Sequence, residues 1–284
     1  MTDLTTSKHF IRSHFGARAG EWATLYHDPE PGLSAQNLIS RQRFALELVE
    51  AVLPPGSTVL DLGCGSGVMA ARLTEHGYTA YGLDLAEPMV RHARHLCASD
   101  QFAVADVDHI PFPDNTFDAV LSLGVLQFLE AEQRALREMW RVLRPGGHAV
   151  IALPSGSSPL QRMDLLILGV VNVLKYRLRG TRRPAPEPAA VIDRRKFSRR
   201  RWLRLLGQAN LEPEAWICHG WGWFESPLAF LVQRLAKGPS ALARGIKRFG
   251  GERVLSRART AFVRTRAVNW LASEQIIRAR AVKT

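Results

Sequence analysis

Short apolar runs alternate with longer amphipathic stretches along the first half of the chain. An apolar run at residues 58–62 leads through a glycine-rich turn into a stretch with helical spacing at residues 68–76, and a second apolar run ends at Asp84. Strands buried on both faces of a parallel sheet have continuous apolar runs, whereas the helices that cover such a sheet have a 3.6-residue apolar period. The pattern therefore predicts a strand–helix–strand unit.

The same alternation predicts most of the remaining elements. We expect a helix at residues 34–52 and another at residues 199–209, whose N-cap is Ser198 because its hydroxyl can accept a backbone hydrogen bond. The further strands are expected at residues 102–107, up to 123, at 148–153, 212–219 and 274–281. Strands that alternate with helices in this way indicate an α/β fold.

Three glycines, Gly63, Gly65 and Gly67, lie between the first strand and the helix that follows it. Glycine has no Cβ, so the backbone can turn sharply and approach a ligand closely, and the start of the helix offers unpaired N–H groups. Asp84, at the tip of the second strand, is placed to accept hydrogen bonds from ribose hydroxyls. A nucleotide-binding unit is predicted. An NAD-type site is an alternative, because residues 65–70 also fit the loose dinucleotide fingerprint.

Asp61, directly before the turn, and the spacing of the glycines resemble motif I of the class I S-adenosylmethionine (SAM) methyltransferases. The resemblance continues, in the same order, through residues 84–89, 102–107, 110–123 and 141–147, and is strongest to the group that includes ubiquinone and menaquinone methyltransferases. It implies a Rossmann-like α/β fold with a seven-stranded, mostly parallel sheet, an antiparallel last strand and helices on both faces. It also implies SAM as the cofactor.

Twelve residues are candidates for binding SAM if the resemblance holds. Asp84 would hold the ribose, Met89 would pack near the adenine, and Asp106 would accept a hydrogen bond from the adenine amino group. Met89 is equally well interpreted as a core residue, and a turn residue is the alternative for Asp106. Cys64 is expected to be a small buried residue rather than a nucleophile. The full set is Asp61, Gly63, Cys64, Gly65, Gly67, Asp84, Leu85, Met89, Asp106, Val107, Leu123 and Tyr26.

The residues available for catalysis indicate the kind of acceptor. Many relatives that methylate hydroxyl groups have a His just after the fourth strand, but this chain has Gln127 there. An acceptor that is already ionised at neutral pH, such as a carboxylate with a pKa of about 4, needs no base at this place. His219, at the end of the sixth predicted strand, is the remaining candidate for a general base, and it is also readily explained as a packing residue.

The domain organisation that we expect is a single methyltransferase domain over residues 1–284. Two insertions, both apolar and basic, leave from the carboxyl ends of strands, where ligands bind in open α/β sheets, so they are expected to form a lid over the acceptor. The expected parts are an N-terminal helical cap (1–53), a SAM-binding core (54–154), the insertions (155–197 and 220–267) and C-terminal core strands (198–219 and 268–284).

Charge is divided unevenly between the two halves of the chain. Residues 1–153 contain 12 basic and 18 acidic residues, a net charge of −6, whereas residues 154–284 contain 26 and 8, a net charge of +18. Basic residues between apolar ones are typical of contact with an anionic membrane surface, although a solvated face with no partner is the alternative. Nucleic acid is an unlikely partner, since the motifs of amino- and base-C5-methylating enzymes are absent from the sequence.

Cysteine usage and hydropathy indicate the compartment. Cys64, Cys97 and Cys218 have neither a metal-ligand spacing nor the even number of a disulfide framework, so we expect a reducing compartment and no metal. The longest mainly apolar stretch, residues 165–174, is too short for a bilayer, which needs roughly 20 residues. A soluble cytoplasmic protein, in peripheral contact with the inner face of the membrane if the basic half binds there, is the resulting expectation.

These observations predict a SAM-dependent methyltransferase that acts on a small amphiphilic acid. The preferred acceptor is a fatty acid or 3-hydroxy fatty acid, which would be converted to its methyl ester, in loose resemblance to bacterial methyltransferases that form such esters. The alternatives are O- or C-methylation of a quinone, phenol or sugar, methylation of RNA, and a SAM-binding protein without enzymatic activity. The pattern leaves the oligomeric state open.

Overall fold

The computed structural model describes residues 4–25, 33–155, 198–221 and 272–283. The chain divides into two compact units, the first of which comprises Met1–Pro154, Arg194–Ile217 and Gln275–Thr284. This first unit, called the sheet unit below, contains nearly all of the described residues. The second unit comprises Ser155–Asp193 and Cys218–Glu274 and is described only at its edges.

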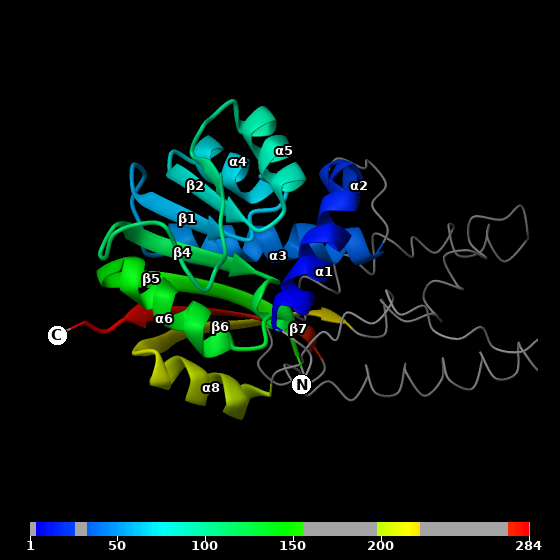
Figure 1. Ribbon diagram of the computed structural model, residues 1–284. Coiled ribbons are helices and arrows are strands. Elements are labelled where there is room, and N and C mark those ends of the chain that lie inside the picture. The colour runs from blue at the N-terminus through cyan, green and yellow to red at the C-terminus, as the bar shows by residue number, and fades with distance from the viewer. Residues whose placement is uncertain (1–3, 26–32, 156–197, 222–271, 284) are drawn as a thin grey trace, which may run out of the picture. The chain divides into compact units, whose positions relative to one another are not determined.

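A seven-stranded sheet forms the centre of the fold, with the strand order β3-β2-β1-β4-β5-β7-β6 (Figure 1). The pairs β1–β2, β1–β4, β2–β3 and β4–β5 are all parallel. The strands are β1 (Thr58–Leu62), β2 (Thr79–Asp84), β3 (Phe102–Val104), β4 (Phe117–Leu123), β5 (Leu143–Pro154), β6 (Leu211–Trp221) and β7 (Ala272–Ala281).

The last strand runs against its two neighbours. Directly after β7, the N–H of Val282 donates to the carbonyl of Asn210, which directly precedes β6 (3.0 Å). The indole N–H of Trp140, just before the start of β5, donates to the carbonyl of Val282 (3.0 Å). The end of β7 therefore lies beside the starts of both neighbours, and the predicted mostly parallel sheet with an antiparallel last strand is confirmed.

Helices cover both faces of the sheet. On one face, α6 and α8 bury Leu136, Met139, Trp202 and Leu206 in the same apolar core as β1, β4, β5 and β7. On the other face, α3 packs against β4 and β5, and α4 and α5 pack against β2 (Figure 1). The helices are α1 (Leu4–Ala17), α2 (Ala19–Leu25), α3 (Leu33–Glu50), α4 (Val68–Glu75), α5 (Glu87–Cys97), α6 (Glu132–Val142) and α8 (Arg199–Gln208), with a 3-10 turn η1 (Leu126–Phe128).

Two strand boundaries differ from the expectation by three residues or more. The fifth strand begins at Leu143 rather than at residue 148, because Leu143 already pairs with Phe117 before a bulge resets the register. The third strand ends at Val104, so Asp106 and Val107 lie in the turn that follows. The cap of α8 is as predicted, since the Ser198 hydroxyl accepts the N–H of Arg201 (3.3 Å).

Hydropathy gives no membrane span among the described residues. None of their helices is both long and apolar enough to cross a bilayer. The two basic insertions expected at residues 155–197 and 220–267 lie almost entirely outside the described residues.

Candidate cofactor and active site

The turn between β1 and α4 is held against the end of β2 by backbone hydrogen bonds. The N–H groups of Gly63 and Cys64 both donate to the carbonyl of Leu83, at 2.7 and 3.0 Å. Gly63 has a φ of +70°, and a Cβ added there would overlap the side chain of Val125, which follows β4. Glycine is therefore required at residue 63 both by the backbone conformation and by close packing.

The other two glycines of the turn meet different surroundings. Gly67 has a φ of +85°, and a Cβ there would lie 2.8 Å from the Cα of Ala93, so the turn packs directly on the backbone of α5. Gly65 also has a positive φ, of +55°, but a Cβ there would have no atom within 4 Å. One side of the turn is thus packed and the side at Gly65 is open, as a site for a ligand requires.

Asp84 ties the glycine turn to the start of α5. Its Oδ2 accepts the N–H of Gly65 (3.0 Å) and its Oδ1 accepts the N–H of Ala86 (2.8 Å). Burial raises the pKa of this carboxyl above its ordinary value, and the hydrogen bonds from Ala86 and Gly65 oppose the rise. Each carboxylate oxygen has a second lone pair, so Asp84 can organise the turn and still accept hydrogen bonds from ribose hydroxyls.

Asp61 lies beneath the turn and is only 2% exposed. Burial raises the pKa of its carboxyl to about 7, the negative charge of Asp84 adds to the rise, and the positive charge of Arg41 opposes it. Arg41 comes from α3, and its guanidinium lies against the backbone of Gly124, just after β4. A carboxylate and a guanidinium near the same turn are suited to the ammonium and carboxylate groups of an amino acid.

Asp106 and Asp108, in the turn after β3, share one lysine. Lys8 Nζ lies 2.5 Å from Asp106 Oδ2 and 2.7 Å from Asp108 Oδ2. The N–H of Asp108 donates to the other oxygen of Asp106 (3.0 Å). Burial alone would raise the pKa of Asp106, but the hydrogen bonds from Lys8 and from the Asp108 N–H lower it below its ordinary value. Asp106, which is expected to accept a hydrogen bond from the adenine amino group, is therefore ionised and is paired with Lys8 of α1.

The N-terminal helices contact the turns that follow β2 and β4. Arg12 Nε donates to the carbonyl of Leu85 (3.1 Å). The ring of Phe15 packs on the rings of Trp22 and Phe128, with centroids 5.9 and 5.4 Å apart. Met89 is 3% exposed and packs with Ala19 and Ala86, which supports its interpretation as a core residue. Tyr26, the predicted lid residue, lies outside the described residues.

The residues just after β4 include Gln127, one of the two residues predicted for catalysis. Gln127, in η1, is 6% exposed, and its amide oxygen accepts no hydrogen bond from any described residue. Leu123 closes β4 and is half-buried, and Val107 is buried in the main core. An amide does not titrate, so Gln127 can hold a ligand by hydrogen bonds but cannot act as a general base.

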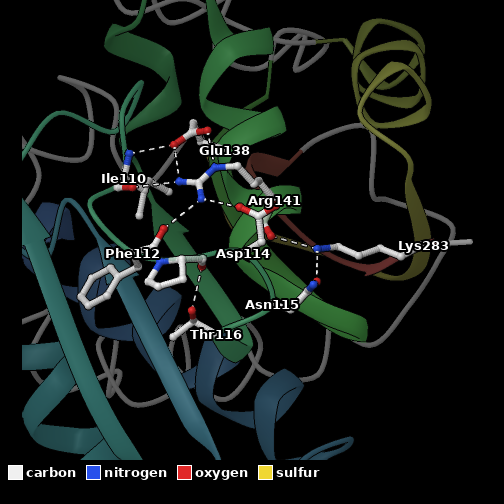
Figure 2. Close-up of polar contacts among 9 residues, drawn as sticks. Ile110, Phe112, Asp114, Asn115, Thr116, Glu138, Arg141 and Lys283 are labelled. Carbon is white, nitrogen blue, oxygen red and sulfur yellow. Dashed lines mark hydrogen bonds and ion pairs between the residues drawn. The ribbon is translucent and has the colours of Figure 1, made fainter.

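Arg141 holds the segment between β3 and β4 in place (Figure 2). The first part of this segment is the turn that contains Asp106 and Asp108, called the adenine turn below because Asp106 is predicted to bind adenine. Its guanidinium donates to the carbonyls of Ile110 (2.8 Å) and Phe112 (2.9 Å), while Glu138 accepts both from Arg141 (2.7 Å) and from the N–H of Ile110 (2.8 Å). The hydrogen bond to Glu138 is the main reason why the pKa of Arg141 is raised. Lys283 extends this network by donating to the carbonyl of Arg141 (2.9 Å). This segment is therefore held in place without a ligand.

Two candidates from the sequence are buried. Cys64 is 7% exposed and burial raises the pKa of its thiol, in agreement with an unreactive loop residue. His219 belongs to the second unit, where it is 1% exposed and its Nε2 lies 3.4 Å from Glu274 Oε2. Its role as a base remains a prediction.

Sequence reasoning missed Arg41, Lys8 and Arg12. Each is an ordinary basic residue on a helix, and only the folded structure shows that each reaches a cofactor loop. A basic residue on a helix that precedes motif I is a weak signal, because most such residues are solvated.

The middle of the chain matches a known family. Residues 60–151 match the family model described as a methyltransferase domain. These residues are a methyltransferase domain, and the predicted methyltransferase superfamily is confirmed for them. SAM, the predicted cofactor, agrees with the S-adenosylhomocysteine bound in two solved methyltransferases of similar fold.

Solved methyltransferases share the fold across nearly the whole chain. The magnesium protoporphyrin IX methyltransferase of Synechocystis, with bound S-adenosylhomocysteine, has a TM-score of 0.59 at 15% identity and covers 96% of this chain and 99% of its own. The 1,6-didemethyltoxoflavin-N1-methyltransferase of Burkholderia thailandensis has a TM-score of 0.58 at 16% identity, with 100% and 92% covered.

Curated relatives match over shorter segments. The malonyl-[acyl-carrier protein] O-methyltransferase of Pectobacterium atrosepticum is 34% identical over 155 residues, which are 54% of this chain and 58% of the relative. The 2-methyl-6-phytyl-1,4-hydroquinone methyltransferase of Synechocystis is 31% identical over 141 residues, 47% of this chain and 44% of the relative. The chain thus spans about half the length of these relatives.

Proposed function

We propose that the protein transfers the methyl group of SAM to the carboxylate of a small amphiphilic acyl substrate and thereby forms a methyl ester. The observation that carries this proposal is Gln127, a buried residue that cannot take up a proton, at the place after β4 where hydroxyl-methylating relatives have a His. A carboxylate is ionised at neutral pH and needs no base, whereas a hydroxyl does.

The chemistry places few demands on the protein. SAM supplies an electrophilic methyl group, and when an oxygen of the acceptor carboxylate bonds to that methyl carbon, the carbon–sulfur bond breaks and its electrons stay on sulfur. The products are a neutral ester and S-adenosylhomocysteine, and no proton moves. The protein has to align the two reactants and exclude water, which is the work of positioning. In this proposal Asp61 and Arg41 hold the amino-acid end of SAM, while Asp84 and Asp106 hold the nucleoside.

The named relatives favour a carboxylate acceptor. Malonyl-[acyl-carrier protein] O-methyltransferases recur among the relatives, at 34–39% identity in those from Pectobacterium atrosepticum and Erwinia pyrifoliae. The acceptor in their name is an acyl group attached to a carrier protein. Because the matches cover only 36% to 54% of this chain, they support the reaction type more strongly than the acyl chain.

Methylation of a quinone is the second candidate. The hydroquinone methyltransferase of Synechocystis and the demethylmenaquinone methyltransferase of Renibacterium salmoninarum are 31% and 30% identical to this chain over comparable lengths. Such acceptors are also amphiphilic, but the new methyl group is attached to carbon or to a hydroxyl oxygen.

Alkali distinguishes the two candidates. The protein should be incubated with methyl-labelled SAM and, separately, with malonyl-coenzyme A, a 3-hydroxy fatty acid and a reduced menaquinone precursor. A carboxyl methyl ester releases labelled methanol in dilute alkali, whereas a methyl group on carbon stays in the product. Alkali-labile label in an acyl product supports the proposal. Alkali-stable label in the quinone alone overturns it in favour of the second candidate.

A further inference from the structure

Two neighbouring helices of the sheet unit carry exposed arginines that meet no carboxylate. Arg134 and Arg137 on α6 and Arg200 and Arg204 on α8 are exposed, and none of their side chains forms an ion pair or a hydrogen bond with another described residue. Most other arginines of this unit are engaged. Ion pairs are formed by Arg43, Arg91, Arg141, Arg144, Arg201, Arg278 and Arg280.

These four residues form one surface, called the arginine face below. The two helices are joined at their N-terminal turns, where Arg201 Nη2 lies 2.9 Å from Glu132 Oε1. Figure 1 shows α6 and α8 side by side on the same side of the sheet, in agreement with their shared apolar core. Within each helix the two arginines are three or four residues apart, so they follow one another along the helix surface about one turn apart.

The arginine face begins at the edge of the sheet where ligands bind. Helix α6 starts at Glu132, shortly after the carboxyl end of β4 and η1. The ion pair between Glu132 and Arg201 holds the first turn of α8 beside the first turn of α6. In open α/β sheets the ligand lies outside the carboxyl ends of the strands. A partner on this face is therefore close to the edge from which an acceptor would enter.

The chemistry of the face favours acidic protein over lipid or nucleic acid. A guanidinium can grip a carboxylate with two parallel hydrogen bonds, and rows of arginines one turn apart match carboxylates on a facing helix. Docking on a membrane by helices needs an apolar side to insert, but α6 and α8 bury theirs, and only Leu203 of α8 is a large exposed apolar residue, at 44%. Single-stranded nucleic acid is bound by stacking on aromatic rings, and none of the exposed residues of these two helices is aromatic.

We propose that the arginine face docks an acidic carrier protein that brings the acyl acceptor as a thioester. This inference rests on the proposed carboxyl methylation and adds how the acceptor is delivered. The first 153 residues have a net charge of −6, so Arg134 and Arg137 form a local positive area within an acidic background, to which α8 adds Arg200 and Arg204 from the basic half of the chain. Such an area orients an acidic partner as it approaches and repels it elsewhere. The acceptor carboxylate enters at the ligand edge while its carrier stays on α6 and α8.

Direct binding tests the surface without relying on catalysis. Bacterial acyl carrier protein is titrated into the full-length protein by calorimetry at low and at raised salt. We expect Arg200→Ala/Arg204→Ala and Arg134→Ala/Arg137→Ala each to weaken binding by about tenfold, and salt to weaken binding to the wild-type protein. Arg43→Ala/Arg91→Ala is the matched control, because it also removes two exposed arginines, from α3 and α5, and should bind like the wild type.

A comparison of two methyl acceptors that carry the same malonyl thioester tests delivery. With malonyl-acyl carrier protein, kcat/KM should fall about tenfold in the two double variants; with malonyl-coenzyme A, which lacks the protein, it should not change. Loss of carrier binding in the control variant, an equal loss with malonyl-coenzyme A, or no binding of the carrier by the wild-type protein would each overturn the docking proposal. So would arginine-dependent binding of anionic vesicles or RNA without binding of the carrier.

The two proposals fail in different ways. If malonyl-coenzyme A is methylated but the carrier does not bind, the docking surface is wrong and carboxyl methylation stands. If the carrier binds through the four arginines but neither thioester is methylated, the docking surface stands and the proposed function is wrong.

Discussion

The two ends of the predicted nucleoside site, at Asp84 for the ribose and at Asp106 for the adenine, are held in different ways. At the ribose end, the glycine turn and Asp84 are fixed by backbone groups of neighbouring strands and helices, with the N–H groups of Gly65 and Ala86 on the carboxylate. At the adenine end, Asp106 is held by its own turn and by Lys8, a residue 98 positions away on α1. The ribose end is therefore part of the core, whereas the adenine end depends on the N-terminal cap.

The largest effect is expected at the packed side of the turn. Gly67→Ala places a Cβ 2.8 Å from the Cα of Ala93 in a backbone with a φ of +85°. We expect a loss of about 2–4 kcal/mol in the free energy of unfolding and loss of SAM binding. Gly207→Ala in α8 is the control, since a Cβ there meets nothing within 4 Å, and it should leave stability unchanged or slightly higher. Equal denaturant midpoints for the two variants would contradict the packing argument.

The next effect is expected at Asp84. Replacing it by Ala leaves the N–H groups of Gly65 and Ala86 without their acceptors, at a cost of about 1–3 kcal/mol, and should weaken SAM binding about 30-fold or more. Asp84→Asn keeps one acceptor oxygen, so its stability and its affinity for SAM should lie between those of Asp84→Ala and the wild type. Calorimetric titration with SAM measures both. An unchanged affinity in the Ala variant would remove Asp84 from the site.

Asp61, which is buried beneath the glycine turn, should make the stability of the protein depend on pH. Its folded pKa of about 7 exceeds its ordinary value, so its protonated form favours the folded state at low pH, and this contribution is lost as the pH rises towards 7. Asp61→Asn cannot ionise, so its stability relative to the wild type should increase steadily between pH 4 and pH 7.5. Urea unfolding across this range tests the sign. A difference that stays constant with pH would show that Asp61 does not titrate there.

The smallest effect is expected at the adenine end. Lys8→Met removes the ion pairs to Asp106 and Asp108 and loosens α1, so SAM should dissociate faster and bind about three- to tenfold more weakly. Because the Lys8 hydrogen bond is lost, the pKa of Asp106 should also rise. Lys8→Arg keeps the positive charge, so its affinity for SAM should be close to that of the wild type. Tighter binding in Lys8→Met would instead mean that Lys8 competes with adenine for Asp106.

The ribose end was predictable from sequence and the adenine end only in part. Gly63, Gly67 and Asp84 lie in one strand–turn–helix–strand unit, so local pattern alone places them. Lys8 and Arg41 come from helices outside that unit, and their contacts arise only when the cap and α3 pack on the sheet.

Strand boundaries that depend on contacts between distant segments were also not predictable from the local sequence. The predicted start of β5 was wrong because its first pairing, Leu143 with Phe117, depends on the neighbouring strand rather than on the Pro-Gly-Gly turn within β5. By contrast, the Ser198 cap is a local signal and was correct. The antiparallel last strand came from the resemblance to a family and not from periodicity.

The network around Arg141 has a consequence for how the chain matures during synthesis. Lys283 donates to the carbonyl of Arg141 and, at 2.6 Å, to the side chain of Asn115 (Figure 2). The segment that leads from the adenine turn into β4 is thus completed by a residue made 142 positions after Arg141. A nascent chain that has already formed its glycine turn still lacks this anchor. Lys283 can therefore join this network only after translation has passed residue 283, when both insertions have already been made.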